Sequence, residues 1–104
     1  MVYSVFFVQE AQAELDEAYL YYEQQQVGLG GIFVEAIRKT QERISHFPQA
    51  WQPLSARTRR ALVSRFPFGI IYHISTDEII IIAIAHLHRK PFYWQGRDDG
   101  GEKR

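Results

Sequence analysis

Cysteine is absent from the 104-residue chain, and long apolar runs are scarce. Without cysteine the chain can form no disulfide scaffold, no cysteine-ligated zinc site and no thiol nucleophile. The longest apolar run, residues 79–85, is far shorter than the ~20 residues that a membrane-spanning helix needs. The first residues also lack the basic flank and apolar stretch of a signal peptide. These absences predict a soluble, cytoplasmic protein that does not enter membranes.

The chain also has no net charge, because 12 basic side chains balance 12 acidic ones. The two halves of the chain nevertheless differ. Residues 1–50 carry 3 basic and 7 acidic side chains, whereas residues 51–104 carry 9 basic and 5 acidic ones. The positive second half indicates an anionic partner. The neutral total argues against strong ribosome docking, because affinity for RNA rises with each phosphate that a cation neutralises.

Hydrophobic residues make up 46% of the chain, which is enough for one folded domain. Residues 2–8 favour a β-strand. Two apolar stripes with helical spacing follow, separated by glycines at 28, 30 and 31. The first stripe consists of Ala11, Leu15, Ala18 and Tyr22. The second consists of Phe33, Ala36, Ile37, Thr40, Ile44 and Phe47, and Pro48 ends its helix.

After a connector at residues 48–58, three segments have the composition of strands: residues 60–66, 70–74 and 79–85. The order β-α-α-β-β-β predicts an α+β domain over residues 1–97, with a helical hairpin packed on a small antiparallel sheet. Residues 98–104 are polar and predict a disordered tail. By the two-residue alternation of strands, Arg59 and Arg65 share one face of the sheet and Arg60 lies on the other.

Several fragments, in order along nearly the whole chain, resemble the RelE/ParE superfamily, the toxins of bacterial type II toxin–antitoxin modules. The fragments are Ala11-x-x-x-Leu15-Asp16-Glu17-Ala18, Phe47-Pro48, Phe66-Pro67-Phe68-x-Ile70-x-Tyr72 and Ile82-x-x-x-His86-x-x-Arg89-x-Pro91-x-Tyr93-Trp94 with Arg97. The last of these fragments, residues 86–97, is most similar to the ParE-like branch of the superfamily. The resemblance implies a RelE/ParE-like fold and a cognate antitoxin that neutralises the toxin, in a role such as plasmid stabilisation. It allows a homodimer or a toxin–antitoxin hetero-oligomer.

The superfamily contains two mechanisms. RelE-like members are similar to ribosome-dependent endoribonucleases that cut mRNA, whereas ParE-like members resemble inhibitors of DNA gyrase without chemistry of their own. Metal-independent RNA cleavage needs a base, phosphate-binding cations and an acid. The candidates for these roles are Arg59, Arg65, His86, His88, Arg89 and Tyr93. The candidates for binding without catalysis are Arg57, Arg60, Arg89, Trp94 and Arg97.

Each candidate also has a structural interpretation. Arg65 could pair with a helix carboxylate such as Glu14 or Glu17. His86 and His88 share a strand face only if the last strand continues to His88. They have no third ligand nearby in sequence, so we expect neither a metal nor another cofactor. The pair Tyr93–Trp94 could stack on a base or cap the core.

Two absences favour the ParE-like mechanism. The strand before Tyr72 has no basic residue, where ribonuclease members of the superfamily usually carry one, and the connector has no lysine. We therefore expect a toxin that inhibits its target, such as gyrase, by binding. An mRNA endoribonuclease and a degenerate, non-toxic antitoxin-binding protein are the alternatives. Under all three, an antitoxin segment covers apolar and basic surface, as a helix in a groove or an added strand.

Overall fold

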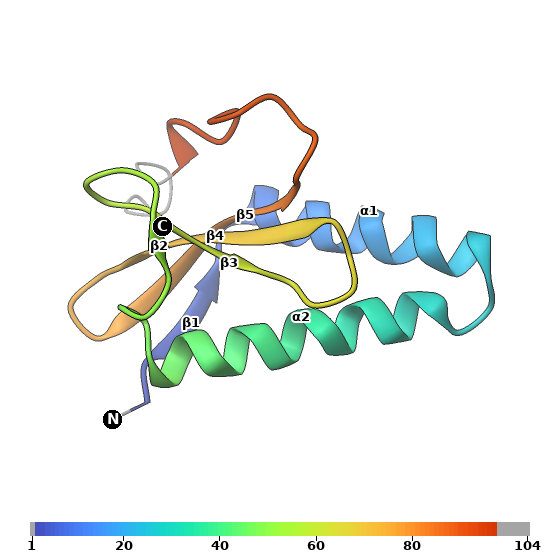
Figure 1. Cartoon of the computed structure of the whole chain (residues 1–104), viewed down its shortest axis with the longest axis horizontal. Helices are drawn as coiled ribbons and strands as arrows, with labels where there is room; N and C mark the ends of the chain where they lie inside the picture. Colours follow the sequence, from blue (N-terminus) through green and yellow to red (C-terminus); the bar gives the residue numbers. More distant parts are fainter. Residues whose placement is uncertain (1, 98–104) are drawn as a thin grey trace.

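The computed structural model describes residues 2–97 and places two helices against a five-stranded sheet (Figure 1). The elements are β1 (Ser4–Phe7), α1 (Gln9–Gln25), α2 (Leu29–His46), β2 (Gln52–Pro53), β3 (Arg59–Leu62), β4 (Phe68–Ile74) and β5 (Glu78–His86). The strand order across the sheet is β1-β5-β4-β3-β2. This arrangement confirms the predicted α+β class and the helical hairpin. The predicted tail, residues 98–104, lies outside the described residues.

The prediction of an antiparallel sheet is wrong at one edge, because β1 runs parallel to β5. The chain between these two strands is long enough to supply the crossover that a parallel pair requires. The other pairs are antiparallel, and β5 carries a bulge opposite Tyr72. The connector also contains a strand that the sequence did not predict: β2 has only two residues, and its Pro53 is tolerated because the strand lies at the edge.

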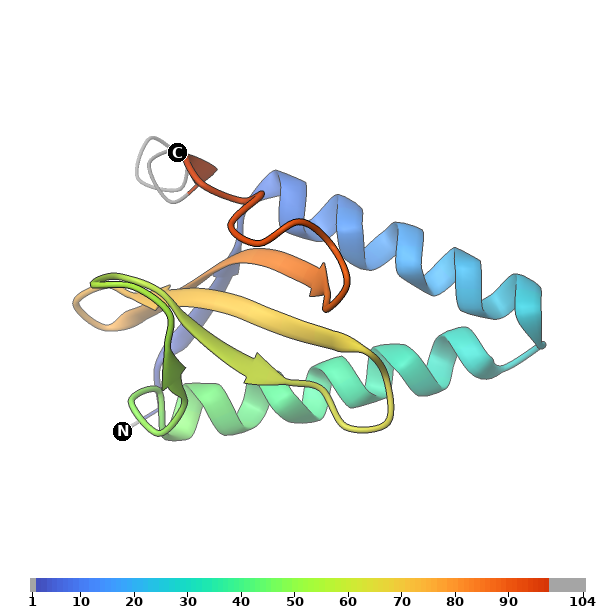
Figure 2. The same cartoon turned by 45° about the horizontal axis from the view of Figure 1, so that its top comes forward.

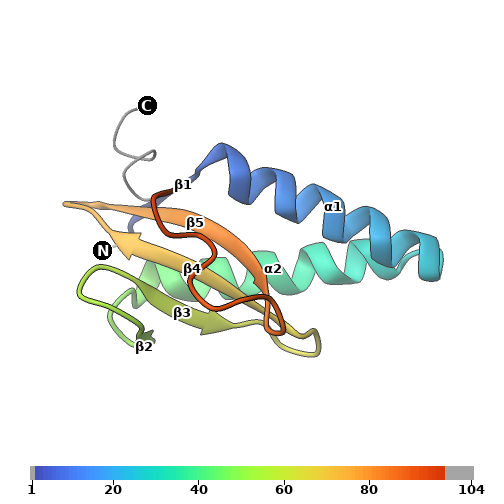
Figure 3. The ribbon, with the colours of Figure 1, turned by 90° about the horizontal axis from the view of Figure 1, so that it is seen from above.

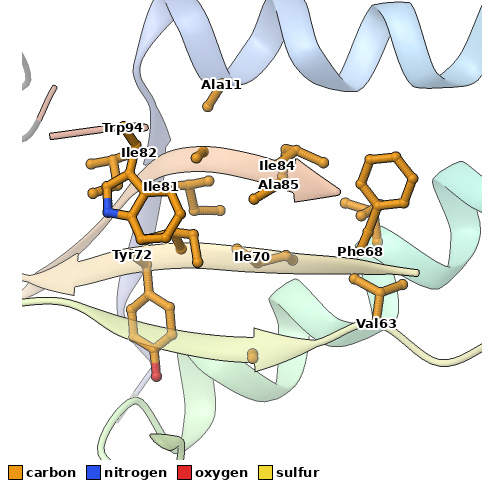
Figure 4. Close-up of a cluster of buried hydrophobic side chains, with 14 of the residues drawn as sticks. Ala11, Val63, Phe68, Ile70, Tyr72, Ile81, Ile82, Ile84, Ala85 and Trp94 are labelled. Atoms are coloured by element: carbon orange, nitrogen blue, oxygen red, sulfur yellow. The ribbon is translucent and has the colours of Figure 1, made fainter. Parts of the chain in front are cut away.

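The core lies between the helices and the central strands β4 and β5, whose residues are almost all buried (Figure 4). An unbroken apolar run is what a strand covered on both faces requires. The predicted stripe of α2 is confirmed at Phe33, Ile37, Thr40 and Ile44, which are all buried. It is wrong at Phe47, which is 67% exposed, because α2 ends at His46 and the chain turns there.

The turn between the helices uses the predicted glycines. Gly28 has a φ of 93°, a conformation that favours glycine, and precedes the first residue of α2. The carboxylate of Glu23 accepts the N–H groups of Gly28 and Gly30 at 2.9 and 3.0 Å. This carboxylate satisfies donors that a helix N-terminus leaves without intrahelical partners. Figure 2 shows the two helices diverging from this turn toward the sheet.

Residues 87–97, which we call the 87–97 segment, cross the side of the sheet opposite α2 (Figure 3). This side is the outer sheet face, and it carries Arg60, Leu62, Ile71 and Ala85. Trp94 covers part of it and is only 8% exposed. Both sides of the central strands are therefore buried. Within residues 2–97, no helix combines the length and apolarity that crossing a bilayer demands.

Candidate functional site

Glu14 of α1 holds the 87–97 segment against β5. Its carboxylate accepts hydrogen bonds from the Ile84 backbone N–H at 3.0 Å, the Tyr93 hydroxyl at 2.8 Å and the Arg97 guanidinium at 3.0 Å. The Arg89 guanidinium lies 3.8 Å from the same carboxylate. The side chains of Glu14 and Arg97 are only 12% and 18% exposed. Charge-assisted hydrogen bonds of this kind are stronger than neutral ones.

The pair of Glu14 and Arg97 also completes the edge of β5. Pairing of β1 with β5 ends at Ile81, so β1 does not cover the edge from Ile82 onward. Arg97 donates to the carbonyl of Ile82 at 3.1 Å, while Glu14 accepts from the N–H of Ile84. The ion pair thus replaces the hydrogen bonds that a neighbouring strand would make. An edge satisfied by side chains is closed to further pairing.

Tyr93 lies between two arginines. The guanidinium carbons of Arg89 and Arg97 are 3.8 and 5.1 Å from the centre of its ring. Burial, followed by the hydrogen bond to Glu14, raises the pKa of Tyr93 far above its ordinary value. The hydroxyl therefore stays protonated at neutral pH and is already committed as a donor, which makes Tyr93 a poor general base.

Arg59 secures the connector between α2 and β3. Its guanidinium donates to the carbonyl oxygens of Trp51 at 2.7 Å and Gln49 at 3.3 Å. Beside it, the Tyr72 hydroxyl donates to the carbonyl of Pro48 at 2.6 Å, and burial raises the pKa of Tyr72 to about 12. These bonds hold a segment with little regular structure onto the sheet. Both hydrogen bonds come from Nη1 of Arg59, so this nitrogen is engaged with the protein itself.

Arg65 does not share a face with Arg59, so this prediction is wrong. The strand β3 ends at Leu62, and Arg65 lies in the turn that precedes Pro67 and β4. Its φ is 75°, the left-handed region that side-chain-bearing residues rarely adopt. The turn carries Arg65 to a groove beside α2. The suggested partner Glu14 is instead bound by Arg97.

The two histidines are neighbours but do not share a strand face, because β5 ends at His86. The imidazole of His86 packs against the ring of Phe68 at 5.1 Å, and its Nδ1 accepts the backbone N–H of His88 at 3.1 Å. This bond places the proton of a neutral His86 on Nε2. Among residues 2–97, no three histidine, aspartate or glutamate side chains are grouped to hold a metal ion.

The remaining binding candidates lie on or near the outer sheet face. The side-chain stem of Arg60 lies so close to Gly69 that an added Cβ there would be 3.0 Å from Arg60 Cγ. Its guanidinium donates to Gln52 at 3.4 Å. Trp94 is packed in the core, whereas Arg57 lines a polar cleft of about 480 Å³. Arg57 therefore lines the polar cleft, whereas Arg60 lines a hollow on the outer sheet face.

The nuclease candidates do not share one hollow. Arg59 lines the polar cleft with Arg57, and Arg65 lines the groove beside α2. His86 and Arg89 line a hollow next to Glu14 and, together with Tyr93, a hollow on the outer sheet face. Sequence reasoning treated Glu14 only as a partner for Arg65 and missed its role as the centre of the cluster. The sequence did contain a signal for this role. Glu14 directly precedes Leu15 of the apolar stripe, so its carboxylate is expected at the boundary between the core and solvent.

The fold is shared with a solved structure described as the chromosomal ParDE toxin–antitoxin system from P. aeruginosa. The two chains superpose with a TM-score of 0.74 at 20% sequence identity, over 84% of this chain and 98% of that chain. At this identity the likeness defines the class of fold, a helical hairpin on a mixed sheet. No curated protein matches the chain in sequence.

The family follows from the sequence comparison. A model of the family described as the ParE toxin of the type II toxin–antitoxin system parDE matches residues 5–91. The match spans most of the chain, and the chain therefore belongs to this family. It is a ParE-like type II toxin, as the fragments ending at Arg97 predicted.

Proposed function

We propose that this toxin inhibits a cellular protein by binding it, without cutting RNA, and that a cognate antitoxin neutralises it. The carrying observation is the dispersal of the nuclease candidates. Arg59 is bound to backbone carbonyls, Tyr93 is bound to Glu14, and Arg65 lines a different hollow from His86 and Arg89. RNA cleavage needs a base, an acid and cations around one phosphate, and dispersed groups do not supply that geometry.

The outer sheet face has features that suit a protein target. Leu62, Leu87 and Phe92 are 53%, 42% and 39% exposed there, and Arg60 and Arg89 line the same hollow as Leu87 and Phe92. Exposed apolar side chains flanked by arginines are typical of protein-binding surfaces. The ParE-like family makes DNA gyrase in the cytoplasm the first target to test.

The experiment is induction of the toxin without antitoxin in bacteria, with DNA supercoiling and translation followed in parallel. We expect growth arrest with altered supercoiling while translation initially continues, and gyrase inhibition by the purified toxin. Phe92→Ala should weaken the effect on gyrase, because it removes a half-exposed aromatic contact from the outer sheet face. Lys39→Ala, on the opposite helical layer, serves as the control.

Two other results would contradict inhibition by protein binding. Ribosome-bound mRNA cut by the purified toxin, with cutting abolished by Arg65→Ala and His88→Ala, would establish the endoribonuclease instead. Harmless expression without antitoxin, from a chain that still binds the antitoxin, would identify a degenerate toxin. Neither result is compatible with inhibition of a protein target.

A further inference from the structure

We propose that a pocket on the outer sheet face binds the C-terminal residue of the protein target. Two arginines hold the α-carboxylate of that residue, and its aliphatic side chain enters the pocket. This inference deepens the proposed function and rests on it, because it presupposes a protein target. The site, which we call the outer-face pocket, is lined by Arg60, Leu87, Arg89, Phe92 and Trp94, with further residues of β4 and β5. Figure 3 shows the 87–97 segment, which forms one wall of the pocket, crossing in front of these two strands.

The size of the outer-face pocket suits a single side chain. Its volume is about 110 Å³. Sites for drug-sized ligands have volumes of about 300–1,000 Å³, so a ligand of that kind does not fit inside. A small apolar pocket that takes one anchoring side chain is instead a common feature of protein–protein contacts.

The walls of the pocket are apolar. Ile71 and Ala85 of the central strands are buried beneath it, and the ring of Trp94 lies 5.4 Å from the ring of Phe92. Leu87 and Phe92 are 42% and 39% exposed, so they leave apolar surface in contact with water. An aliphatic side chain that enters the pocket removes this surface and its own from water, which favours binding.

The backbone at Phe92 shows that an aromatic ring is placed at the pocket at a cost. The N–H of Tyr93 donates to the carbonyl of Lys90 at 3.3 Å, which closes a turn with Phe92 as its third residue. Phe92 has a φ of 61°, a conformation that glycine or asparagine adopts more readily than a bulky residue. Unfavourable backbone conformations of this kind cluster at functional sites, where the surrounding structure maintains them.

Arg60 supplies one cation to the pocket. The stem of its side chain lies against Gly69, while its Nη2 donates to Gln52 at the long distance of 3.4 Å. Its Nε is buried and has no hydrogen-bond partner in the structure of residues 2–97. A buried donor without an acceptor is unfavourable, and a carboxylate at this guanidinium would provide acceptors on two oxygens.

Arg89 supplies the second cation. Its guanidinium lies 3.8 Å from the ring centre of Tyr93 and 3.8 Å from the carboxylate of Glu14, whose oxygens already accept three shorter hydrogen bonds. The side chain of Arg89 is 53% exposed, so its N–H groups remain open to a ligand. None of the described residues that line the outer-face pocket is acidic. The pocket therefore complements a ligand that is apolar and negatively charged.

The closeness of the apolar and cationic groups favours a chain terminus over an internal acidic segment. Both kinds of group line the same hollow of about 110 Å³, so the apolar and anionic parts of the ligand must be close together. In an extended internal segment, neighbouring side chains point to opposite faces, and those two positions apart are about 7 Å from each other. A C-terminal residue carries its α-carboxylate and its side chain on the same Cα atom, and capture of such a carboxylate is an established mode of peptide recognition.

The test titrates the full-length, purified toxin with short peptides and follows binding by NMR at the Trp94 indole and the backbone of residues 87–94. The first probe is the acetylated peptide Gly-Ser-Gly-Leu with a free C-terminal carboxylate. Its C-terminal amide should bind at least about tenfold more weakly, because it lacks the charge that the arginines bind. The same peptide ending in serine tests the apolar pocket, and amidated Gly-Leu-Asp-Gly tests an internal acid; both should also bind more weakly.

Three variants locate the peptide on the toxin. Arg60→Met keeps a side-chain stem against Gly69 and removes the charge, so it should weaken binding at least about tenfold. Phe92→Gly should weaken binding about fivefold while the protein remains folded, because glycine adopts this φ without strain. Arg43→Met makes the same substitution as Arg60→Met on α2, outside the pocket, and should change binding less than about twofold. Circular dichroism establishes that each variant is folded.

A competition experiment connects the pocket to the target. Saturating peptide with the free carboxylate should restore the activity of a target inhibited by the toxin, whereas the amide should not. Equal binding of the acid and the amide, wild-type affinity in Arg60→Met and Phe92→Gly, or binding without competition would overturn the inference and leave the proposed function intact. A toxin that binds the peptide in this pocket but inhibits no protein would instead count against the proposed function.

Discussion

At the scale of single residues, Glu14 is the side chain on which the most distant parts of the chain converge. It joins α1 to the N–H of Ile84, to Tyr93 and to Arg97. A largely buried carboxylate is stable only when donors surround it, and here three donors do. The same contacts position the 87–97 segment, whose Leu87 and Phe92 belong to the proposed target surface.

Replacement of Glu14 by alanine should lower the free energy of unfolding by about 2 kcal/mol, because it leaves the Ile84 N–H without its acceptor and the buried Arg97 without its carboxylate. Glu17→Ala, at an exposed position one turn away, is the control and should change stability by less than about 0.5 kcal/mol. Urea unfolding measures both. Hydrogen exchange should show faster exchange at residues 87–97 in Glu14→Ala; unchanged protection there would contradict the proposed anchoring.

Tyr72 predicts how stability depends on alkaline pH. Burial raises its pKa from 10.0 to about 12, so the folded state favours the neutral phenol. This contribution is fully present below pH 10, where both states are protonated, and is lost as the pH rises from about 10 to about 12. Thermal unfolding from pH 8 to 11.5 should show this loss.

Tyr72→Phe provides the comparison. It removes the hydrogen bond to Pro48 and should be less stable at pH 8 by about 1 kcal/mol, yet it should lose less stability above pH 10. Burial also raises the pKa of Tyr93 and Tyr22, so a smaller alkaline loss remains in the variant. Identical slopes for the two proteins would contradict the assignment to Tyr72.

At the scale of elements, the geometry of two connections decides where charged groups lie. The turn between β3 and β4 takes Arg65 away from the strand face that alternation assigned to it. The turn between α1 and α2 brings Gly30 against Tyr19, where the ring and carbonyl atoms of Tyr19 are 2.8 Å from the position of an added Cβ. Close packing of this kind leaves no room for a methyl group.

The neighbouring glycines provide a matched pair of substitutions. Gly30→Ala should destabilise the fold by about 1–3 kcal/mol, because the hairpin must open to admit the Cβ. Gly31→Ala has no atom within 4 Å of its new Cβ and should stabilise α2 by about 0.5–1 kcal/mol. Thermal or urea unfolding separates the two; a stabilising Gly30→Ala would show that the helices do not approach closely at Tyr19.

At the scale of the whole molecule, charge is divided between the layers. Residues 2–50, which form β1 and both helices, carry 3 basic and 7 acidic side chains, whereas residues 51–97 carry 7 basic and 2 acidic ones. The fold modifies this division. It moves Glu14 onto the basic part, where it binds Arg97, and places the cations of α2 beside Arg65. A neutral protein thus presents a positive groove on one side and arginines on the outer sheet face.

The sequence determined the helices, the central strands and the family. Helical spacing placed Phe33, Ile37 and Ile44 in the core, and the apolar run of residues 79–85 indicated a strand. Hydrophobic periodicity predicts these features because the side chains that one face of a helix or strand buries recur at a fixed spacing in the sequence of that element. The ordered fragments ending at Arg97 predicted the ParE-like toxin family, which the family match over residues 5–91 confirms.

Only the tertiary structure decided which charged groups meet. The parallel pairing of β1 with β5 leaves the edge at Ile84 for Glu14 to fill, and the turn at Arg65 moves its charge to the groove beside α2. Glu14 and Arg97 are 83 residues apart, so no local pattern connects them. Contacts of this kind depend on strand order and on the paths of turns, which are set by packing across the molecule and not by the spacing of neighbouring residues.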